Sequence, residues 1–580
     1  MFEIKEKFYL NGEPFQIISG AIHYFRTVPE YWRDRLEKLV NIGCNTVETY
    51  IPWNFHEPNE GEFLWDGMHD VCRFIETANE LGLYMIVRPS PYICAEWEFG
   101  GLPAWLLKDR NMRLRCSYKP YLEAVRRYYE VLIPKIAAYQ IDRGRNIILV
   151  QIENEYGYYG NDAAYLEFLR DTMREFGITV PFVTSDGPWS KPGFKSGMVE
   201  GALPTGNFGS AAEWQFGQMK KFMGDDKPMM CMEFWNGWFD AWGEEHHTTE
   251  PEKAAAELDE LLKMGSINFY MFEGGTNFGF MSGRNSGNKT ADVTSYDYDA
   301  PLTEDGRITE KYRLCKEIIS KYRDFEEISL TTEIRRKAYG EIFCVGKADL
   351  FSVLERISES ALSAYPLTME DIGQNYGYIL YRLKIKDTEL VNEIRLENAA
   401  DRIQCYHNGE YLYTAYAENI HEKFEPQKKQ SGGVIDLLCE NIGRENFGTG
   451  LENQRKGIMG SVKINDHRYF GYEIFPLPLD ENQLDRIDFS SGYQANVPAF
   501  YKFEFDVQEL CDTFLDTDGF GKGCAFINGF NLGRFWEIGP QKRLYIPAPH
   551  LKKGKNTLIL FETEGKAAER INLYDEAFLG

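Results

Sequence analysis

The feature that most restricts the fold of this chain is a repeated order, between residues 15 and 280, of a short apolar run followed by a longer amphipathic stretch. The runs are apolar throughout, which is typical of strands buried on both faces of a parallel sheet. They cover residues 15–24, 45–53, 83–92, 146–156, 180–187, 202–209, 227–235 and 267–279. The intervening segments predict helices over residues 31–42, 68–81, 119–139, 163–176, 210–223 and 250–263.

Eight strands that alternate with helices predict an α/β fold, a closed (β/α)8 TIM barrel. The sixth run is the weakest of the eight, because Pro204 and Gly206 interrupt it. After about residue 325 the pattern changes to short alternating strands and Gly/Asn turns, as in YILYRLKI (378–385). This change predicts two all-β sandwich domains that pack against the barrel.

The expected domain limits follow from these changes in pattern. We expect a catalytic barrel over residues 1–328 and a connector over 329–375, whose strands could join the last sandwich. The first sandwich is expected over 376–470 and the second over 471–580.

Charge and cysteine usage exclude several classes of partner. A formal charge of -25 argues against binding to nucleic acid or to an anionic membrane. We see neither an export signal nor a run of about 20 apolar residues, so a cytoplasmic protein is expected. The 11 cysteines form neither a disulfide framework nor a metal-binding pattern. We therefore expect reduced thiols, no metal and no cofactor. Small neutral substrates and a homodimer remain open.

The segment VQIENEYG (150–157) points to the chemistry. An apolar strand here runs straight into Glu153, Asn154 and Glu155, at the end of the fourth expected strand, and Glu233 ends the seventh. Active sites of TIM barrels lie at the carboxyl ends of the strands. Hydrolysis of a glycosidic bond needs one carboxylic acid to protonate the leaving oxygen and a second carboxylate to attack or to activate water. An ion pair on the barrel rim is the simpler alternative for either Glu alone.

Several long motifs resemble the β-galactosidases of glycoside hydrolase family 35. They are TYIPWNFHEP (49–58), RPSPYICAEWEFGGLPAWLL (88–107), VQIENEYG (150–157), EFWNGWFDAWG (233–243), FYMFEGGTNFG (269–279), TSYDYDAPL (294–302) and FINGFNLGRFWEIGPQ (526–541). The resemblance implies a retaining exo-β-galactosidase and β sandwiches that are jelly-roll-like and galactose-binding-like. The missing export signal suggests short oligosaccharides as substrates, with a preference for β-1,3 linkages as a further hypothesis. A β-glycosidase of other sugar specificity, such as a glucosaminidase, and a catalytically silent carbohydrate-binding protein remain as alternatives.

The resemblance also implies roles for individual residues. Glu155 matches the acid/base, Glu233 matches the nucleophile, and Asn154 matches the residue that holds the substrate 2-hydroxyl. Tyr270 matches a tyrosine that hydrogen-bonds the nucleophile. The positions that match galactose contacts are Tyr50, Ala95, Glu96 and Tyr298. Beyond the resemblance, we expect Trp235 or Trp238 to form an aromatic wall against the second sugar.

Overall fold

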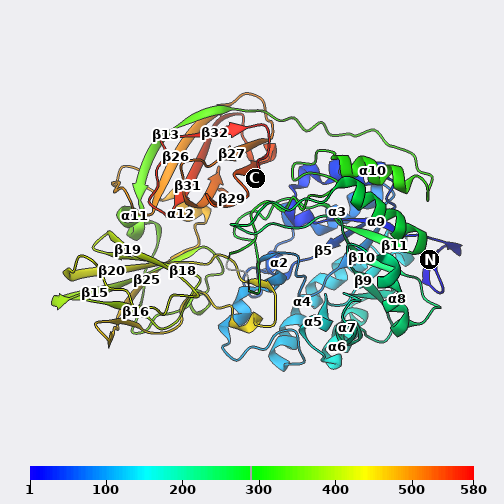
Figure 1. Ribbon diagram of the computed structural model, residues 1–580, viewed down its shortest axis with the longest axis horizontal. Helices are drawn as coiled ribbons and strands as arrows, with labels where there is room; N and C mark the ends of the chain where they lie inside the picture. Colours follow the sequence, from blue (N-terminus) through cyan, green and yellow to red (C-terminus); the bar gives the residue numbers. More distant parts are fainter. Residues whose placement is uncertain (288–289) are drawn as a thin grey trace.

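Eight parallel strands close into a barrel in the computed structural model, which describes residues 1–287 and 290–580 (Figure 1). The strands are β4 (Ile18–Ile22), β5 (Thr46–Tyr50), β6 (Tyr84–Arg88), β7 (Ile147–Gln151), β8 (Phe182–Asp186), β9 (Ala202–Asn207), β10 (Met230–Trp235) and β11 (Ser266–Glu273). Each pairs with the next along the chain, and β11 pairs with β4 to close the ring. The predicted TIM barrel is confirmed, including its sixth strand.

Helices cover the outside of the barrel. The six predicted ones are α1 (Trp32–Ile42), α3 (Val71–Glu80), α4 (Lys119–Ala137), α6 (Ala163–Glu175), α8 (Ala212–Met223) and α9 (Pro251–Met264). The four-residue helices α2 (Trp53–His56) and α5 (Tyr156–Tyr159) were not predicted. Two longer helices, α7 (Lys191–Gly197) and α10 (Glu310–Ile319), were not predicted either. The first contains a proline and two glycines that hide any helical pattern. The second is separated from β11 by a long loop, so it does not follow its strand directly.

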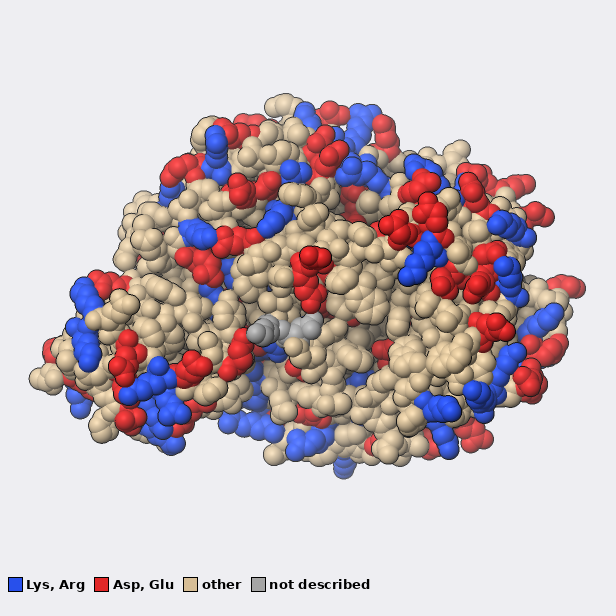
Figure 2. Space-filling model, in the orientation of Figure 1, with Lys and Arg blue, Asp and Glu red and all other residues tan. Residues whose placement is uncertain are grey.

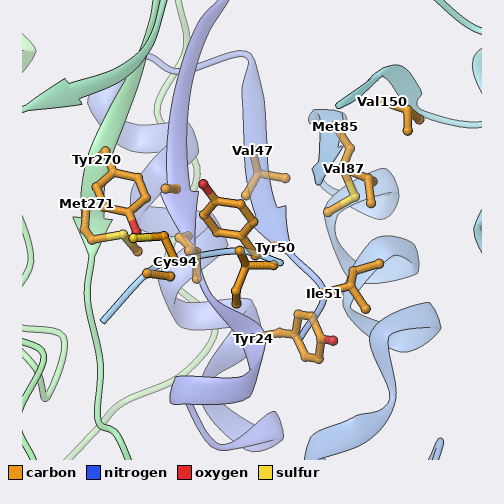
Figure 3. Close-up of a cluster of buried hydrophobic side chains, with 14 of the residues drawn as sticks. Tyr24, Val47, Tyr50, Ile51, Met85, Val87, Cys94, Val150, Tyr270 and Met271 are labelled. Atoms are coloured by element: carbon orange, nitrogen blue, oxygen red, sulfur yellow. The ribbon is translucent and has the colours of Figure 1, made fainter. Parts of the chain in front are cut away.

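Alternate residues of the barrel strands face different surroundings. Val47, Met85, Val87 and Val150 belong to the same buried cluster as the covering helices (Figure 3). The intervening residues, such as Ile86, belong to a second cluster inside the barrel. This alternation is the usual two-residue period of a strand.

A small N-terminal sheet covers the amino ends of the barrel strands. It consists of β1 (Phe2–Ile4), β2 (Phe8–Leu10) and β3 (Glu13–Pro14). Phe2 and Phe8 are buried in the cluster that fills the barrel interior, together with Leu149 and Met230. Access to the barrel is therefore from the opposite end, where the strands have their carboxyl ends.

The first β domain is built on a six-stranded antiparallel sheet. In spatial order its strands are β14 (Ala361–Ser363), β25 (Tyr472–Leu477), β15 (Tyr378–Leu390), β20 (Ser431–Glu440), β18 (Arg402–His407) and β19 (Glu410–Tyr416). Smaller pairings join β16 (Ile394–Leu396), β23 (Val462–Ile464) and β24 (His467–Arg468), and also β17 (Ala399–Ala400) and β22 (Gly457–Ile458). The strand β25 pairs with β15 along its whole length, although it lies past the boundary expected at residue 470. Strand pairing therefore extends the first β domain beyond that boundary.

The second β domain contains eight strands. In spatial order they are β29 (Phe530–Trp536), β28 (Lys522–Ile527), β31 (Gly554–Glu562), β26 (Ala499–Val507), β13 (Gly340–Asp349), β32 (Arg570–Tyr574), β27 (Thr513–Asp516) and β30 (Arg543–Ile546). Two short helices, α11 (Leu350–Ile357) and α12 (Glu481–Asp485), lie near it in Figure 1. The strand β13 comes from the connector, so this domain is assembled from segments on both sides of the first β domain. Figure 1 shows β13, in green, among the orange and red strands.

The β domains are joined to the barrel by paired strands and buried polar contacts. The barrel segment β12 (Arg284–Asn285) pairs with β21 (Glu445–Phe447) of the first β domain. Thr294 of the barrel donates a hydrogen bond to the carbonyl of Arg534 in the second β domain at 2.7 Å. These contacts bring a loop of the first β domain to the carboxyl ends of the barrel strands.

Charged side chains of both signs are spread over the surface, and the cysteine side chains are mostly buried. Figure 2 shows acidic and basic side chains interspersed over the visible face rather than gathered into a basic patch. None of the 11 cysteines forms a disulfide, and most are buried. Among the described residues, no helix combines the length and the apolar character needed to cross a membrane.

Candidate active site

A pocket of about 250 Å³ opens at the carboxyl ends of the barrel strands. It is lined by all ten residues singled out in the sequence: Tyr50, Ala95, Glu96, Asn154, Glu155, Glu233, Trp235, Trp238, Tyr270 and Tyr298. Its volume lies near the lower end of the range for ligand pockets, roughly 300 to 1,000 Å³. The residues come from the ends of different strands and the loops that follow them, which is how TIM barrels build their sites.

The segment that follows β7 directs one polar side chain away from the pocket and two into its wall. Glu153 faces away from the pocket and accepts a bidentate pair of hydrogen bonds from Arg115, at 2.9 and 2.8 Å. Asn154 and Glu155 line the pocket. The backbone reaches this arrangement with left-handed φ angles of 54° at Glu153 and 46° at Glu155. Such angles cost about 1–3 kcal/mol at non-glycine residues and are concentrated at functional sites.

The side-chain oxygen of Asn154 is held in place by its neighbours. It accepts hydrogen bonds from Arg88 at 2.7 Å and Gln151 at 3.2 Å, and it lies 2.9 Å from the hydroxyl of Tyr50. These contacts fix the orientation of the amide, so its NH2 group is the part that remains for the pocket.

Glu233 is surrounded by hydrogen-bond donors. Its Oε1 accepts from Arg88 at 2.7 Å and lies 2.9 Å from the hydroxyl of Tyr50, and its Oε2 accepts from the indole of Trp235 at 3.1 Å. Arg88 is fully buried, and its guanidinium also lies over the ring of Tyr50 at 3.9 Å. Three donor groups, one of them a buried cation, therefore lie around the carboxyl group of Glu233.

Glu155 lies in a different environment. Its Oε1 accepts one hydrogen bond, from Asn207 at the end of β9, at 3.0 Å. Burial, followed by the negative charge of Glu233, raises the pKa of Glu155 to about 7. The two carboxyl groups of the pocket therefore have different surroundings, as expected of an acid and a nucleophile.

Two more carboxyl groups lie at this site. Burial raises the pKa of Glu96, in the pocket wall, and of Glu48, beneath the pocket, to about 7. Glu96 follows Cys94 and Ala95, and these three consecutive residues have φ angles of 58°, 58° and 49°. This left-handed turn brings Ala95 and Glu96 into the pocket wall.

The structure corrects the expected partner of Tyr270. Its hydroxyl lies 3.4 Å from the hydroxyl of Tyr296, which in turn donates a hydrogen bond to Glu96. The tyrosine hydroxyl within hydrogen-bond distance of Glu233 belongs instead to Tyr50, because β5 ends beside Glu233 and Arg88. Tyr270 lines the pocket and packs against Tyr298, with ring centroids 5.6 Å apart.

Aromatic side chains form the outer part of the pocket. Trp235 and Trp238 meet edge to face, and Trp189 packs on Trp235, each pair with ring centroids 5.4 Å apart. Trp189, Phe239, Asn285 and Phe447 line the pocket but were missed in the sequence. Phe447 belongs to the first β domain, so no pattern within the barrel sequence could have indicated it. The tryptophan just after β8 could have been recognised as an aromatic residue at a strand end.

Two histidines near the barrel mouth lie within hydrogen-bond distance of other side chains. His23 lies 2.6 Å from Arg26, and His56 lies 2.5 Å from the hydroxyl of Tyr24. Over residues 1–287 and 290–580, no group of three or more His, Cys, Asp or Glu side chains is placed to hold a metal ion.

Three segments of the chain match known protein families. Residues 7–322 match glycosyl hydrolases family 35, residues 366–478 match the first all-beta domain of beta-galactosidase, and residues 498–556 match its galactose-binding domain. Beta-galactosidase-1-like protein 2 of Homo sapiens is 38% identical over 99% of this chain and 91% of its own length.

Two other relatives are similar over nearly the whole chain. Beta-galactosidase 17 of Arabidopsis thaliana is 36% identical over 98% of this chain and 88% of its own length. Beta-galactosidase of Homo sapiens is 37% identical over 97% of this chain and 87% of its own length. Because the family 35 match covers residues 7–322 and these relatives are similar over nearly the whole chain, the protein belongs to glycosyl hydrolases family 35.

Proposed function

We propose that the protein is a retaining exo-β-galactosidase that removes terminal β-galactose from short oligosaccharides. The observation that carries this proposal is the contrast between two carboxyl groups in one pocket. Glu233 has three donor groups within hydrogen-bond distance, whereas Glu155 has one and a pKa of about 7. Glycosidases need one ionised and one protonated carboxyl group.

In the first step, the carboxylate of Glu233 attacks the anomeric carbon and forms a covalent galactosyl-enzyme. The bond from that carbon to the leaving oxygen breaks, and Glu155 gives its proton to this oxygen. In the second step, Glu155 takes a proton from water, and the resulting hydroxide displaces Glu233 from the anomeric carbon. Two inversions retain the β configuration.

The residues around Glu233 are suited to hold one sugar. Asn154, Tyr50, Tyr298 and Glu96 line the pocket, and their side chains offer hydrogen-bond donors and acceptors for sugar hydroxyl groups. We assign galactose as the sugar because the relatives similar over nearly the full chain carry the name beta-galactosidase. Comparison of initial rates on a panel of nitrophenyl glycosides checks this assignment; faster hydrolysis of a glucosaminide would overturn it.

Azide rescue separates the roles of the two carboxyl groups. With a dinitrophenyl galactoside, Glu155→Ala should still form the intermediate, and azide should restore turnover to give β-galactosyl azide. Glu233→Ala should lose both steps, and azide entering the vacated face should give the α product. Formation of the α-azide by the Glu155 variant, or of the β-azide by the Glu233 variant, would reverse the assignment.

Trp235 and Trp238 are proposed to form a wall against the leaving sugar, which would favour a defined linkage such as β-1,3 to an N-acetylhexosamine. Their rings lie in the outer part of the pocket, and Trp238 is 39% exposed. Substitution of each by Ala should impair hydrolysis of the disaccharide more than hydrolysis of nitrophenyl galactoside. Equal loss on both substrates would remove the wall from the proposal.

A further inference from the structure

A second cavity, of about 340 Å³, adjoins the active-site pocket. The two cavities share Trp189, Trp235 and Trp238 as lining residues. The other walls of the second cavity come from the loop after β9, from the loop after β10, and from the first turns of α8 and α9. It lies outside the part of the site that surrounds Glu155 and Glu233, since neither residue lines it.

The second cavity lies on the side toward which a leaving group would depart. Glu155 follows β7 and is hydrogen-bonded to Asn207 at the end of β9, so the acid faces the β8–β9 side of the barrel mouth. Trp189 follows β8 and lines both cavities. A chain of sugars attached to the oxygen that Glu155 protonates would therefore pass Trp189 and enter the second cavity.

One polar group of the second cavity is buried without a partner among the described residues. The side-chain oxygen of Gln215 is buried and has no hydrogen-bond partner among the described residues. Lys253, an exposed residue, also lines this cavity. Glu257 accepts a hydrogen bond through its Oε2 from the backbone of Ala211. An unsatisfied buried acceptor is uncommon in folded proteins and calls for an explanation such as a bound polar group.

These groups match the chemistry of a neutral sugar. Gln215 and Glu257 offer acceptors, Lys253 offers donors, and sugar hydroxyl groups both donate and accept. The indole rings of Trp189 and Trp235 supply an apolar surface beside them. A cavity that combines aromatic walls with a few convergent polar groups is the usual form of a small-molecule site.

We propose that the second cavity binds the second sugar of the leaving group, so that the preferred substrate is a β-galactosyl oligosaccharide of at least three sugars. This inference rests on the proposed galactosidase activity. It assigns Gln215 and Lys253 as positioning residues that act on the distal sugar and not on the bond that is cleaved.

The test compares kcat/KM for three substrates in the full-length protein: a β-galactosyl trisaccharide, the disaccharide that lacks its reducing-end sugar, and nitrophenyl galactoside. Wild-type protein should favour the trisaccharide over the disaccharide. In Gln215→Ala and Lys253→Ala, the ratio of kcat/KM for the trisaccharide to that for the disaccharide should fall about 5- to 10-fold, as expected for loss of one hydrogen bond. Lys263→Ala, on the same helix but outside the cavity, is the matched control and should leave this ratio unchanged.

The outcomes distinguish the two proposals. An absence of turnover of nitrophenyl galactoside by folded wild-type protein would overturn the proposed function itself. Turnover of nitrophenyl galactoside with no advantage for the trisaccharide, or with equal losses on all three substrates in the two variants, would overturn the second subsite alone. A selective loss for the trisaccharide, confined to Gln215→Ala and Lys253→Ala, supports it.

Discussion

At the scale of single residues, the site depends on how neighbouring carboxyl groups are given different surroundings. Glu153 and Glu155 are separated by one residue, yet only Glu155 reaches the pocket. The carboxylate of Glu153, on the side away from the pocket, accepts two hydrogen bonds from Arg115. It accepts a further one from the hydroxyl of Tyr165 at 2.9 Å. A bidentate guanidinium pair is rigid, so Glu153 anchors the strained turn that presents Asn154 and Glu155.

The raised pKa of Glu155 leads to a prediction about pH. Because Glu155 must be protonated to assist departure of a poor leaving group, kcat/KM for an oligosaccharide should be highest below its pKa of about 7. Above this value the rate should fall about tenfold for each pH unit. In Glu155→Ala, formation of the intermediate from dinitrophenyl galactoside should lose this decline. Persistence of the same decline in the variant would assign it to another group, such as Glu96.

At the scale of elements, the barrel strands could be predicted from the sequence, whereas some of the helices could not. Burial on both faces makes most of the strands β4 to β11 rich in apolar residues, and this pattern is visible without any tertiary information. α7 was missed because its proline and glycines carry no helical period; its Ser190 cap and its packing against α5 (Tyr156–Tyr159) stabilise it instead. A local sequence pattern thus predicts elements whose residues are uniformly buried. It misses elements that are stabilised by packing against one neighbouring element.

The N-terminal sheet provides a prediction at this scale. Phe8 is 2% exposed and stacks on Phe2 with ring centroids 5.8 Å apart, at the amino end of the barrel. Phe8→Ala should lower the stability of the barrel by about 3–5 kcal/mol, because it removes a large buried side chain and leaves a cavity. Thermal unfolding measures the change. Lys7→Ala, an exposed neighbour, is the control, and a shift no larger than that of the control would show that the sheet does not stabilise the barrel.

At the scale of the whole molecule, the β domains take part in the construction of the site. Phe447 of the first β domain lines the pocket, and the hydroxyl of Tyr92 donates a hydrogen bond to the carbonyl of Asn446. The buried Arg444 binds Glu98 of the barrel and Glu370 of the β domain, each at 2.6 Å. Since Glu98 belongs to the loop that carries Ala95 and Glu96, the interface also supports the pocket wall.

Arg444 gives a prediction for the interface. Arg444→Ala should destabilise the protein by about 3–5 kcal/mol, because two buried carboxylates would lose their counter-ion. It should also lower kcat/KM, because the loop that carries Ala95 and Glu96 would shift when Glu98 loses its contact with Arg444. Thermal unfolding and initial rates check both effects against Arg356→Ala, which removes an exposed pair with Asp488. Equal behaviour of the two variants would mean that the Arg444 contacts contribute nothing to the interface.

The sequence by itself determined the barrel, the presence of two β domains, and the residues at the strand ends, because strand burial and strand-end chemistry are local properties of the chain. All ten residues singled out from motifs lie around one pocket. Only the tertiary structure decided which groups contact one another: Tyr50 rather than Tyr270 beside Glu233, β13 in the last sheet, and Phe447 in the pocket. These contacts join residues far apart in the chain, and their geometry depends on how separate elements pack, which no local pattern encodes.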